Sequence, residues 1–293
     1  MAVKSPSANL PKTSRFTEYV DNQDRLPFWA RSTNPIVRRH LGLYWRTLPP
    51  EIEPFIVIFA IWSVLIGIGV LFQPFISVTM ITFLASVMVL PISGLLYAHV
   101  LLTIAIDASN AMQQEFSNNT FELLQATPMT LPQILLGKVA AAMWRRMDDI
   151  VMLSQLVLAF SPPIVYTMYI NVFPADDYTA LAPALLALLG MVVATLRIFL
   201  EPLMIGVISV FIGVVVPGKG RAISSAVVIG AFYFLLINLL SRLPQVRGFE
   251  APEGPVPPNG VLIIVTDLVL PVLLPILITL GLLKLAEYVL RQD

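Results

Sequence analysis

An uncharged apolar stretch follows the polar start of the chain and reads Phe55-Ile-Val-Ile-Phe-Ala-Ile-Trp-Ser-Val-Leu-Ile-Gly-Ile-Gly-Val-Leu-Phe72. A helix on the surface of a soluble protein is apolar along one stripe only, whereas this stretch would be apolar on every side. Its length is close to the ~20 residues that a helix needs to cross a hydrocarbon core of ~30 Å. The stretch therefore predicts a transmembrane helix.

Five more apolar runs follow it, and the whole composition agrees with a membrane protein. Hydrophobic residues make up 57% of the 293 residues and charged residues only 12%, against about a quarter charged in soluble domains. We expect an all-α polytopic membrane protein in which residues 51–293 form one domain of six transmembrane helices. The further runs are Val78 to Ile106, Ile150 to Ile170, Leu181 to Val216, Ala222 to Leu240 and Val261 to Leu283.

The run Leu181 to Val216 is too long for a simple span. A continuous helix would measure about 54 Å, and Arg197, Glu201 and Pro202 interrupt it. Either its first part is an outer or re-entrant segment, or the helix is broken. A seven-span alternative would let Leu203 to Val216 cross alone and would place the C-terminus outside.

Charge and cysteine content exclude several classes of protein. Eighteen Lys and Arg balance eighteen Asp and Glu, so the one-sided basic surface that nucleic acid requires is missing. The chain has no cysteine, which rules out disulfides, thiol nucleophiles, zinc–thiolate sites and iron–sulfur clusters.

The first 50 residues form a separate polar segment with one amphipathic stretch. Asn34 before Pro35 predicts a helix start, and we expect a helix over about 35–48. Val37, Leu41 and Tyr44 recur on one face, while arginines lie off it. This pattern favours a helix in the membrane interface, with packing on a protein neighbour as the alternative.

The distribution of Lys and Arg predicts the orientation of the chain. With a cytoplasmic N-terminus and six spans, fifteen Lys and Arg fall on the cytoplasmic side and only Arg242 and Arg247 on the outer side. We therefore expect both termini to be cytoplasmic in a protein of the cell membrane. The last outer connection, 241–260, contains five prolines, so it cannot be helical throughout.

The polar segment 107–149 between the second and third runs carries strong local signals. Asn119 followed by Glu122 predicts a capped helix of about two turns that Pro128 ends. Thr130 followed by Gln133 repeats the capping-box spacing and predicts a second helix start. We expect two short helices joined by a Thr-Pro turn.

These residues resemble a known family. The stretch Glu115-Phe-Ser-Asn-Asn-Thr-Phe-Glu-Leu-Leu-Gln-Ala-Thr-Pro128, continuing to Leu135-Leu-Gly-Lys138, is similar to the cytoplasmic coupling segment of ABC-2 type transporter permeases. The usual family pattern is Glu-x-x-x-Gly-Thr-x-Glu-x-Leu-x-x-Thr-Pro. Asn119 replaces the usual Gly, and Asn is the side chain that best tolerates left-handed backbone.

The resemblance implies a function for the chain. A separate ABC ATP-binding subunit would dock on the coupling helix, and the chain would be a permease, more often an exporter, without enzymatic activity or a cofactor of its own. ATP and Mg²⁺ would bind to that partner, and a second permease subunit, identical or related, would complete the translocation unit. The coupling residues implied are Glu115, Thr120, Phe121, Glu122, Leu123, Leu124, Gln125, Thr127 and Pro128. Phe121, Leu124 and Gln125 would form the ridge that enters a groove of the partner.

Other patterns are better explained without chemistry. The run from Gly213 to Gly220 imitates a Walker A loop but lacks Ser or Thr after Lys219. We read it as a tight cytoplasmic turn in which Lys219 and Arg221 give a second, smaller contact for the ATPase. His40 and His99 have no neighbours at metal-ligand spacing, and Asp148 and Asp149 beside Arg145 and Arg146 indicate a salt-bridge cluster.

Ionisable residues inside spans are functional candidates by default. Arg197 and Glu201 lie four residues apart, so they are either a structural ion pair or part of the translocation path. Asp267 lies near the start of the last span. Two other classes remain open, an ion-gradient-driven secondary transporter or channel and an intramembrane enzyme. Lipid, drug, peptide and glycan-lipid cargo all suit an apolar lining.

Overall fold

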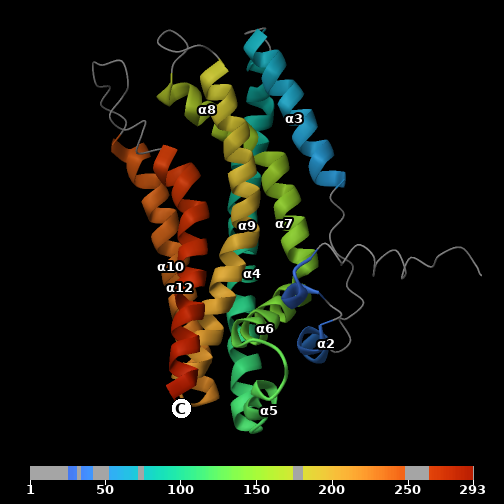
Figure 1. Ribbon diagram of the computed structural model, residues 1–293. Helices are drawn as coiled ribbons and strands as arrows, with labels where there is room; N and C mark the ends of the chain where they lie inside the picture. The colour runs from blue at the N-terminus through green and yellow to red at the C-terminus, as the bar shows by residue number, and fades with distance from the viewer. Residues whose placement is uncertain are drawn as a thin grey trace, which may run out of the picture.

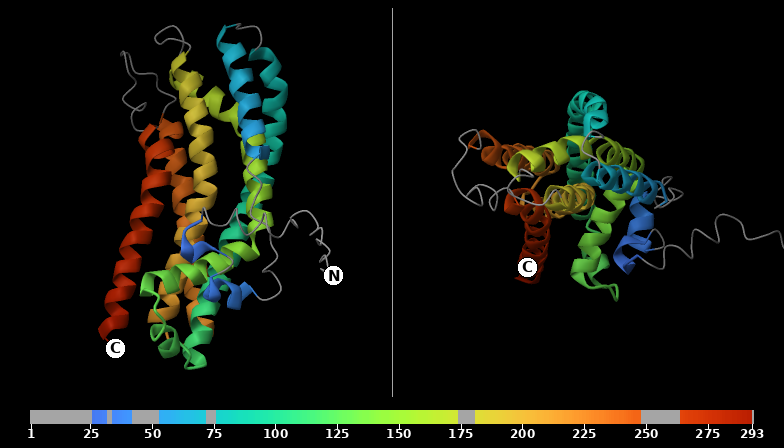
Figure 2. Two further views of the ribbon diagram at one scale, coloured as in Figure 1. Left: turned by 45° about the vertical axis from the view of Figure 1, so that its right-hand side comes forward. Right: turned by 90° about the horizontal axis from the view of Figure 1, so that it is seen from above.

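The computed structural model describes residues 26–31, 34–41, 53–71, 76–173, 181–247 and 264–292. About 91% of these residues are helical and none of them forms a strand. The helices run along one axis in an elongated bundle, with a short crosspiece near one end (Figures 1 and 2). The all-α fold expected from the apolar runs is confirmed.

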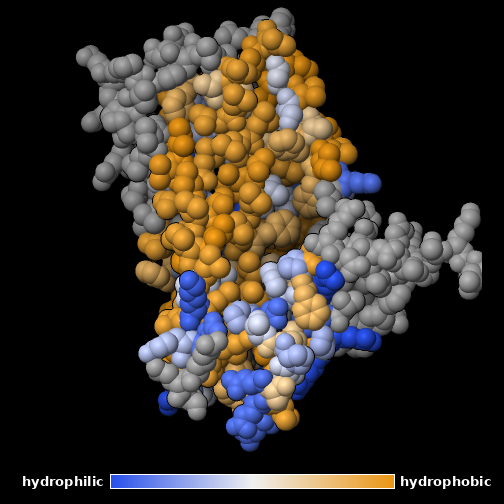
Figure 3. All heavy atoms as spheres, in the orientation of Figure 1, coloured by the Kyte–Doolittle hydropathy of each residue, from blue (hydrophilic) through white to orange (hydrophobic). Residues whose placement is uncertain are grey.

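Among the described residues, five helices are long and apolar enough to cross a membrane, and a bent pair raises the number to six. The five comprise α3 (Glu53–Leu71), α4 (Ile76–Ser117), α9 (Leu181–Val215), α10 (Lys219–Arg247) and the last helix, which joins η4 (Val265–Val269) to α12 (Leu270–Gln292). Apolar side chains cover the long flank of the bundle, and hydrophilic side chains gather at the end that carries the crosspiece (Figure 3). The surface therefore suits a protein that spans a lipid bilayer.

The two longest helices, α4 and α9, extend well beyond a bilayer core of ~30 Å. Helix α4 has 42 residues and α9 has 35, or about 63 and 52 Å. The expected re-entrant first part and broken helix in 181–216 are wrong, because α9 is continuous through Pro202. An outer first part stays a prediction. Helix α4 continues past Asp107 to Ser117, so the first part of the polar segment 107–149 belongs to this helix.

The third apolar run is a bent helix. Helices α7 (Met147–Phe160) and α8 (Pro162–Val172) meet at Ser161 with a bend of 43°. Pro163 has no N–H, which leaves the Ala159 carbonyl without its helical partner. The indole of Trp62 in α3 donates to this carbonyl at 3.1 Å. The bend is thus the point where the peripheral helix α3 is anchored.

The last two spans differ from the expected boundaries. Helix α10 runs to Arg247, so the expected outer connection 241–260 begins as helix, and its remainder lies outside the described residues. The final span opens with one π-helical segment, η4, which contains Asp267. Such segments are rare and often mark functional sites.

Four short or crossing helices lie at the hydrophilic end of the bundle. They are η1 (Phe28–Ala30), α2 (Pro35–Leu41), α5 (Phe121–Gln125) and α6 (Leu131–Arg145). Helix α6 crosses the ends of the long helices, and α5 is at the tip (Figure 1). The turn between α9 and α10 and the end of α12 lie at this same end.

Helix α2 does not use its apolar face as expected. Asn34 does cap it, since its side-chain oxygen accepts the Ile36 N–H at 2.9 Å. However, Val37 and Leu41 are buried against Ala140 and Trp144 of α6. The apolar stripe therefore packs on protein, the alternative left open by the sequence, and residues 42–48 lie outside the described residues.

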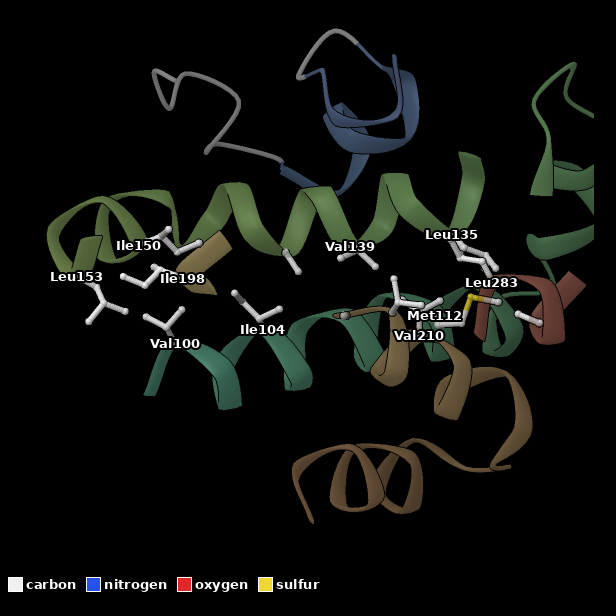
Figure 4. Close-up of a cluster of buried hydrophobic side chains, with 14 of the residues drawn as sticks. Val100, Ile104, Met112, Leu135, Val139, Ile150, Leu153, Ile198, Val210 and Leu283 are labelled. Carbon is white, nitrogen blue, oxygen red and sulfur yellow. The ribbon is translucent and has the colours of Figure 1, made fainter. Parts of the chain in front are cut away.

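The largest core cluster joins α6 to the long helices. Figure 4 shows Leu135 and Val139 of α6 facing Ile104 and Met112 of α4, with Val210 of α9 beside them. Two glycines of α9 permit this close packing. A Cβ on Gly206 would lie 2.4 Å from Val139 Cγ1, and one on Gly213 would lie 2.9 Å from Met112 Cβ. The crosspiece is thus held rigidly against the spans.

Candidate functional site

The end of α4 is shaped by the motif that the sequence singled out. Asn119 has φ of +51°, the left-handed geometry that Asn tolerates better than most side chains. Its N–H donates to the Phe116 carbonyl at 3.2 Å, and the Thr120 N–H donates to the Glu115 carbonyl at 3.0 Å. This is a Schellman ending, in which Asn119 occupies the position usually taken by Gly.

The same geometry corrects the expected start of the next helix. Asn119 is not the N-cap of α5, because it terminates α4; the N-cap is Thr120, without a side-chain capping bond. The Thr120 hydroxyl instead donates to the carboxylate of Glu115. Asn119 therefore ends α4, and the hydrogen bond from Thr120 to Glu115 holds this helix end in place.

Helix α5 presents a different apolar face from the one expected. Phe121 is buried, with its ring 5.1 Å from that of Phe116, and Leu124 is half-buried. The exposed apolar side chain is Leu123, at 69%. Glu122, Gln125 and Pro128 are also exposed. The predicted ridge of Phe121, Leu124 and Gln125 is thus wrong for Phe121, which is buried against Phe116, whereas Leu124 is half-buried and Gln125 is exposed.

The connection to α6 follows the sequence closely. Thr127 closes α5 by donating its hydroxyl to the Leu124 carbonyl at 2.6 Å. Thr130 and Gln133 form the expected capping box, with the Thr130 N–H donating to Gln133 Oε1 at 3.0 Å. Gly137 lets α2 approach α6, because a Cβ there would lie 3.3 Å from Ile36 Cγ2.

A buried polar cluster links three helices beneath α5. Glu115 of α4 and Lys138 of α6 are 2% and 0% exposed, and their charged groups lie 3.1 Å apart. His40 of α2 approaches both, with its Nε2 3.2 Å from the Lys138 ammonium and 3.3 Å from the carboxylate. Arg39 lies 3.6 Å from the same carboxylate. Glu115 therefore holds α2, α6 and the start of α5 at once.

Burial governs the protonation of this cluster outside the spans. Burial, together with the neighbouring Lys138 ammonium, lowers the pKa of His40 to about 4. Burial also lowers the pKa of Lys138, to about 8, although the Glu115 carboxylate opposes that shift. At neutral pH the imidazole is therefore uncharged and can accept a hydrogen bond from the ammonium.

A neighbouring set of contacts supports the same junction. Arg145 of α6 donates to the His40 carbonyl and lies 4.0 Å from Asp107 of α4. Arg146 pairs with Asp149 at 3.8 Å, which agrees with the expected salt-bridge cluster. The indole of Trp144 donates to the Ala30 carbonyl at 2.7 Å. The described part of the N-terminal segment, residues 26–31 and 34–41, is thus tied to α6.

The turn between α9 and α10 is short, as predicted. Gly218 has φ of +91° and ends the short turn between α9 and α10, and Lys219 and Arg221 are exposed in the first turn of α10. Gln113 of α4 donates to the Gly213 and Val216 carbonyls at 2.6 and 2.9 Å. These carbonyls end α9 and lack helical partners, so Gln113 fixes this turn to the helix that carries α5.

A second buried polar group lies within the spans. Arg197 Nε and Glu201 Oε1 of α9 are 2.5 Å apart, as the spacing of four residues predicts. The hydroxyl of Tyr97 in α4 donates to the other oxygen of Glu201. Tyr233 of α10 lies beside that carboxylate, and Asp267 of η4 lies within electrostatic reach of Arg197.

The sequence indicated some members of each polar cluster but not the partners that lie on other helices. It named Glu115 and Thr120 but not Lys138 or His40 as their partners. The available signal was Lys138 itself, a single charge in the otherwise uncharged stretch 134–144, since a buried Lys requires a partner. Tyr97 gave no signal, because a Tyr in an apolar run is unremarkable.

Comparison of the chain with protein-family models finds no matching family, and comparisons with curated proteins and with solved structures find no significant match.

Proposed function

We propose that the chain is the membrane-spanning permease subunit of an ATP-binding cassette transporter of the ABC-2 type. A separate ATP-binding subunit would dock on α5, hydrolyse ATP with its own Mg²⁺ and move a substrate, more often outward. A second permease subunit would complete the pathway. The protein would lie in the cell membrane with six spans and both termini in the cytoplasm.

The observation that carries the proposal is the construction of α5. It is a short helix at the tip of the hydrophilic end, with Leu123 exposed and Phe121 anchored (Figure 1). Leu123 lies on a short helix at the hydrophilic end, so a partner that covers it would remove apolar surface from water. The apolar side chain on a fixed short helix fits the groove of a partner protein.

The buried cluster around Glu115 would transmit a movement of α5 to the membrane-spanning helices. A displacement of α5 pulls on Thr120, whose hydroxyl holds Glu115. Glu115 is paired with Lys138, and α6 packs tightly on α4 and α9 through Val139 and its neighbours. Because α4 and α9 continue into the apolar part of the bundle, movement of α5 would reach the spans as a rigid-body tilt.

The second contact is the turn that carries Lys219 and Arg221. It lies at the same end as α5 (Figure 1) and is fixed to α4 by Gln113. Two exposed cations suit an acidic rim on the ATP-binding subunit, where they would set orientation more than affinity.

The test is association of the chain with the ATP-binding subunit encoded nearest to its gene. Leu123→Asp places a charge in the proposed apolar contact, so co-purification from nanodiscs and substrate-dependent ATP turnover should fall by about tenfold or more. Gln114→Asp is the matched control, because this exposed side chain lies one turn before the end of α4. If Leu123→Asp binds and couples normally, α5 is not the docking element.

A second candidate is a secondary transporter driven by an ion gradient. The buried Arg197–Glu201 pair and the π-helical start of the last span favour it, because ion sites in such proteins lie where membrane helices are interrupted. Uptake into proteoliposomes that contain this chain alone, driven by a proton or sodium gradient, would support this candidate over the permease.

A further inference from the structure

Two carboxyl groups from different membrane-spanning helices lie near the guanidinium of Arg197. Glu201 belongs to α9, like Arg197 itself, and Asp267 belongs to the π-helical segment η4 that opens the last span. Asp267 interacts electrostatically with Arg197. The segment η4 packs on α9, where a Cβ on Gly190 would lie 3.9 Å from Leu268 Cδ2. The two carboxyl groups therefore share one cation.

The charges of this cluster do not balance if both carboxyl groups are ionised. Two carboxylates and one guanidinium would leave a negative charge inside helices that are apolar enough to cross a membrane. Such a charge is expensive there, and a carboxyl group takes up a proton instead. Glu201 already holds Arg197 Nε at 2.5 Å and the hydroxyl of Tyr97. The hydrogen bond to Asp267 from the Thr266 hydroxyl is long, at 3.4 Å, so Asp267 is the group left to bind the proton.

The guanidinium of Arg197 is able to serve either carboxyl group. Its bond to Glu201 uses Nε, and the N–H groups of the two terminal nitrogens suit a second carboxylate. The side chain is 23% exposed, so packing does not enclose it completely. Tyr169 of α8, near Asp267, and Tyr233 of α10, near Glu201, are uncharged at neutral pH and do not compete for the cation.

The backbone of η4 places Asp267 at an irregular point of the last span. Pro271 has no N–H, so the Asp267 carbonyl cannot receive the α-helical bond from that residue. The helix is wider here, and the Leu270 N–H donates to the Val265 carbonyl in the π-helical pattern. Such segments often occur at functional sites.

We propose that Arg197 and one proton exchange places between Glu201 and Asp267. In the present arrangement the guanidinium is at Glu201 and the proton is on Asp267. In the other arrangement the guanidinium turns to Asp267, which gives up its proton, and Glu201 takes up a proton. The total charge is the same in both, but in the second an ion pair joins α9 to the last span. The cluster is thus a proton-linked switch between two spans, which goes beyond the transport function proposed above and concerns this chain alone.

The experiment measures the infrared C=O band of protonated carboxyl groups at neutral pH, in dodecyl maltoside, a detergent without carbonyl groups. Asp267→Asn should lose the band of one carboxyl group per chain. Glu201→Gln should lose it as well, because Arg197 then turns to Asp267 and keeps it ionised. Arg197→Met should instead gain the band of one carboxyl group, since both acids are then protonated.

The variants separate the switch from simpler arrangements. An unchanged band in Asp267→Asn would show that Asp267 is ionised at neutral pH and would overturn the proposal. A band lost in Asp267→Asn but kept in Glu201→Gln would show a protonated Asp267 that does not exchange with Glu201, and would overturn the switch.

The control is Asp148→Asn, at an exposed carboxylate of α7, which should leave the band unchanged. The amide bands of the same spectra show whether each variant keeps its helices, and the opposite sign expected for Arg197→Met cannot come from a general loss of structure. No ATP-binding subunit is present, so a failure here leaves the docking of α5 untouched. A failure of Leu123→Asp to disturb association would likewise leave this switch untouched.

Discussion

The ion pairs Glu115–Lys138 and Arg197–Glu201 are built in opposite ways, although each contains a fully buried carboxylate. The first joins residues 23 positions apart on two helices, and α2 and Thr120 gather around it. The second joins residues four apart on one helix, and its bond to another helix is the one from Tyr97. The cluster around Glu115 therefore holds separate helices together. The Arg197–Glu201 pair mainly fixes two side chains of the same helix relative to each other.

The largest loss in the free energy of unfolding is expected from Lys138→Met. This change leaves the buried carboxylate of Glu115 without its main partner, and removal of one partner of a buried pair costs about 3–5 kcal/mol. The measurement is equilibrium unfolding in mixed micelles of a mild detergent and dodecyl sulfate. The double variant Glu115→Gln with Lys138→Met should regain part of the loss, and a cost below about 1 kcal/mol for the single change would remove the distinction between the two pairs.

A smaller effect is expected from Arg197→Met. The buried carboxyl group of Glu201 keeps the hydrogen bond from Tyr97 and takes up a proton once the guanidinium is gone. The contacts of α2 and α6 are untouched, so the cost should resemble the loss of one charged hydrogen bond, about 1.5–3 kcal/mol. The same unfolding assay applies. A cost equal to or greater than that of Lys138→Met would show that the intrahelical pair carries as much tertiary structure as the interhelical one.

The smallest effect is a pH dependence of the free energy of unfolding that comes from His40 in the cluster around Glu115. The pKa of His40 is lowered from 6.5 to about 4, so between these values the unfolded chain binds a proton that the folded chain does not. Stability is therefore present above pH 6.5 and lost as the pH falls toward 4. Unfolding measured at pH 7 and pH 5.5 should show a loss of about 1 kcal/mol.

The control for this dependence is His40→Gln, which cannot titrate in this range. It should reduce the loss between the two pH values, whereas Arg197→Met should leave the loss unchanged. An identical pH dependence in His40→Gln would assign the effect to other groups.

Local spacing explains what the sequence predicted well. The i, i+4 pair on α9, the capping box of Thr130 and Gln133, the Asn34 cap and the Gly218 turn all depend on residues within one helical turn or one loop. The apolar runs likewise predicted helices. In the hydrocarbon core of a membrane a helix bonds every backbone N–H and C=O group within its own segment.

Tertiary packing explains what the sequence missed. Pro202 suggested a broken helix, but the packing of α9 against α4 and α12 keeps it continuous. Asn119 suggested an N-cap, since a helix end and a helix start use the same residue types one position apart. The exposed side of α5 was misjudged because Phe116, on which Phe121 packs, lies beyond the turn.

The most direct test of the account is site-directed cross-linking from α5. Because the chain has no cysteine, Leu123→Cys and Gln114→Cys each give a single reactive site at the same end of the bundle. With a short cysteine-to-amine cross-linker in membranes that contain the ATP-binding subunit, we expect Leu123→Cys to give a cross-linked product and Gln114→Cys to give little. Equal products from both, or none from Leu123→Cys with an associated subunit, would contradict docking on α5.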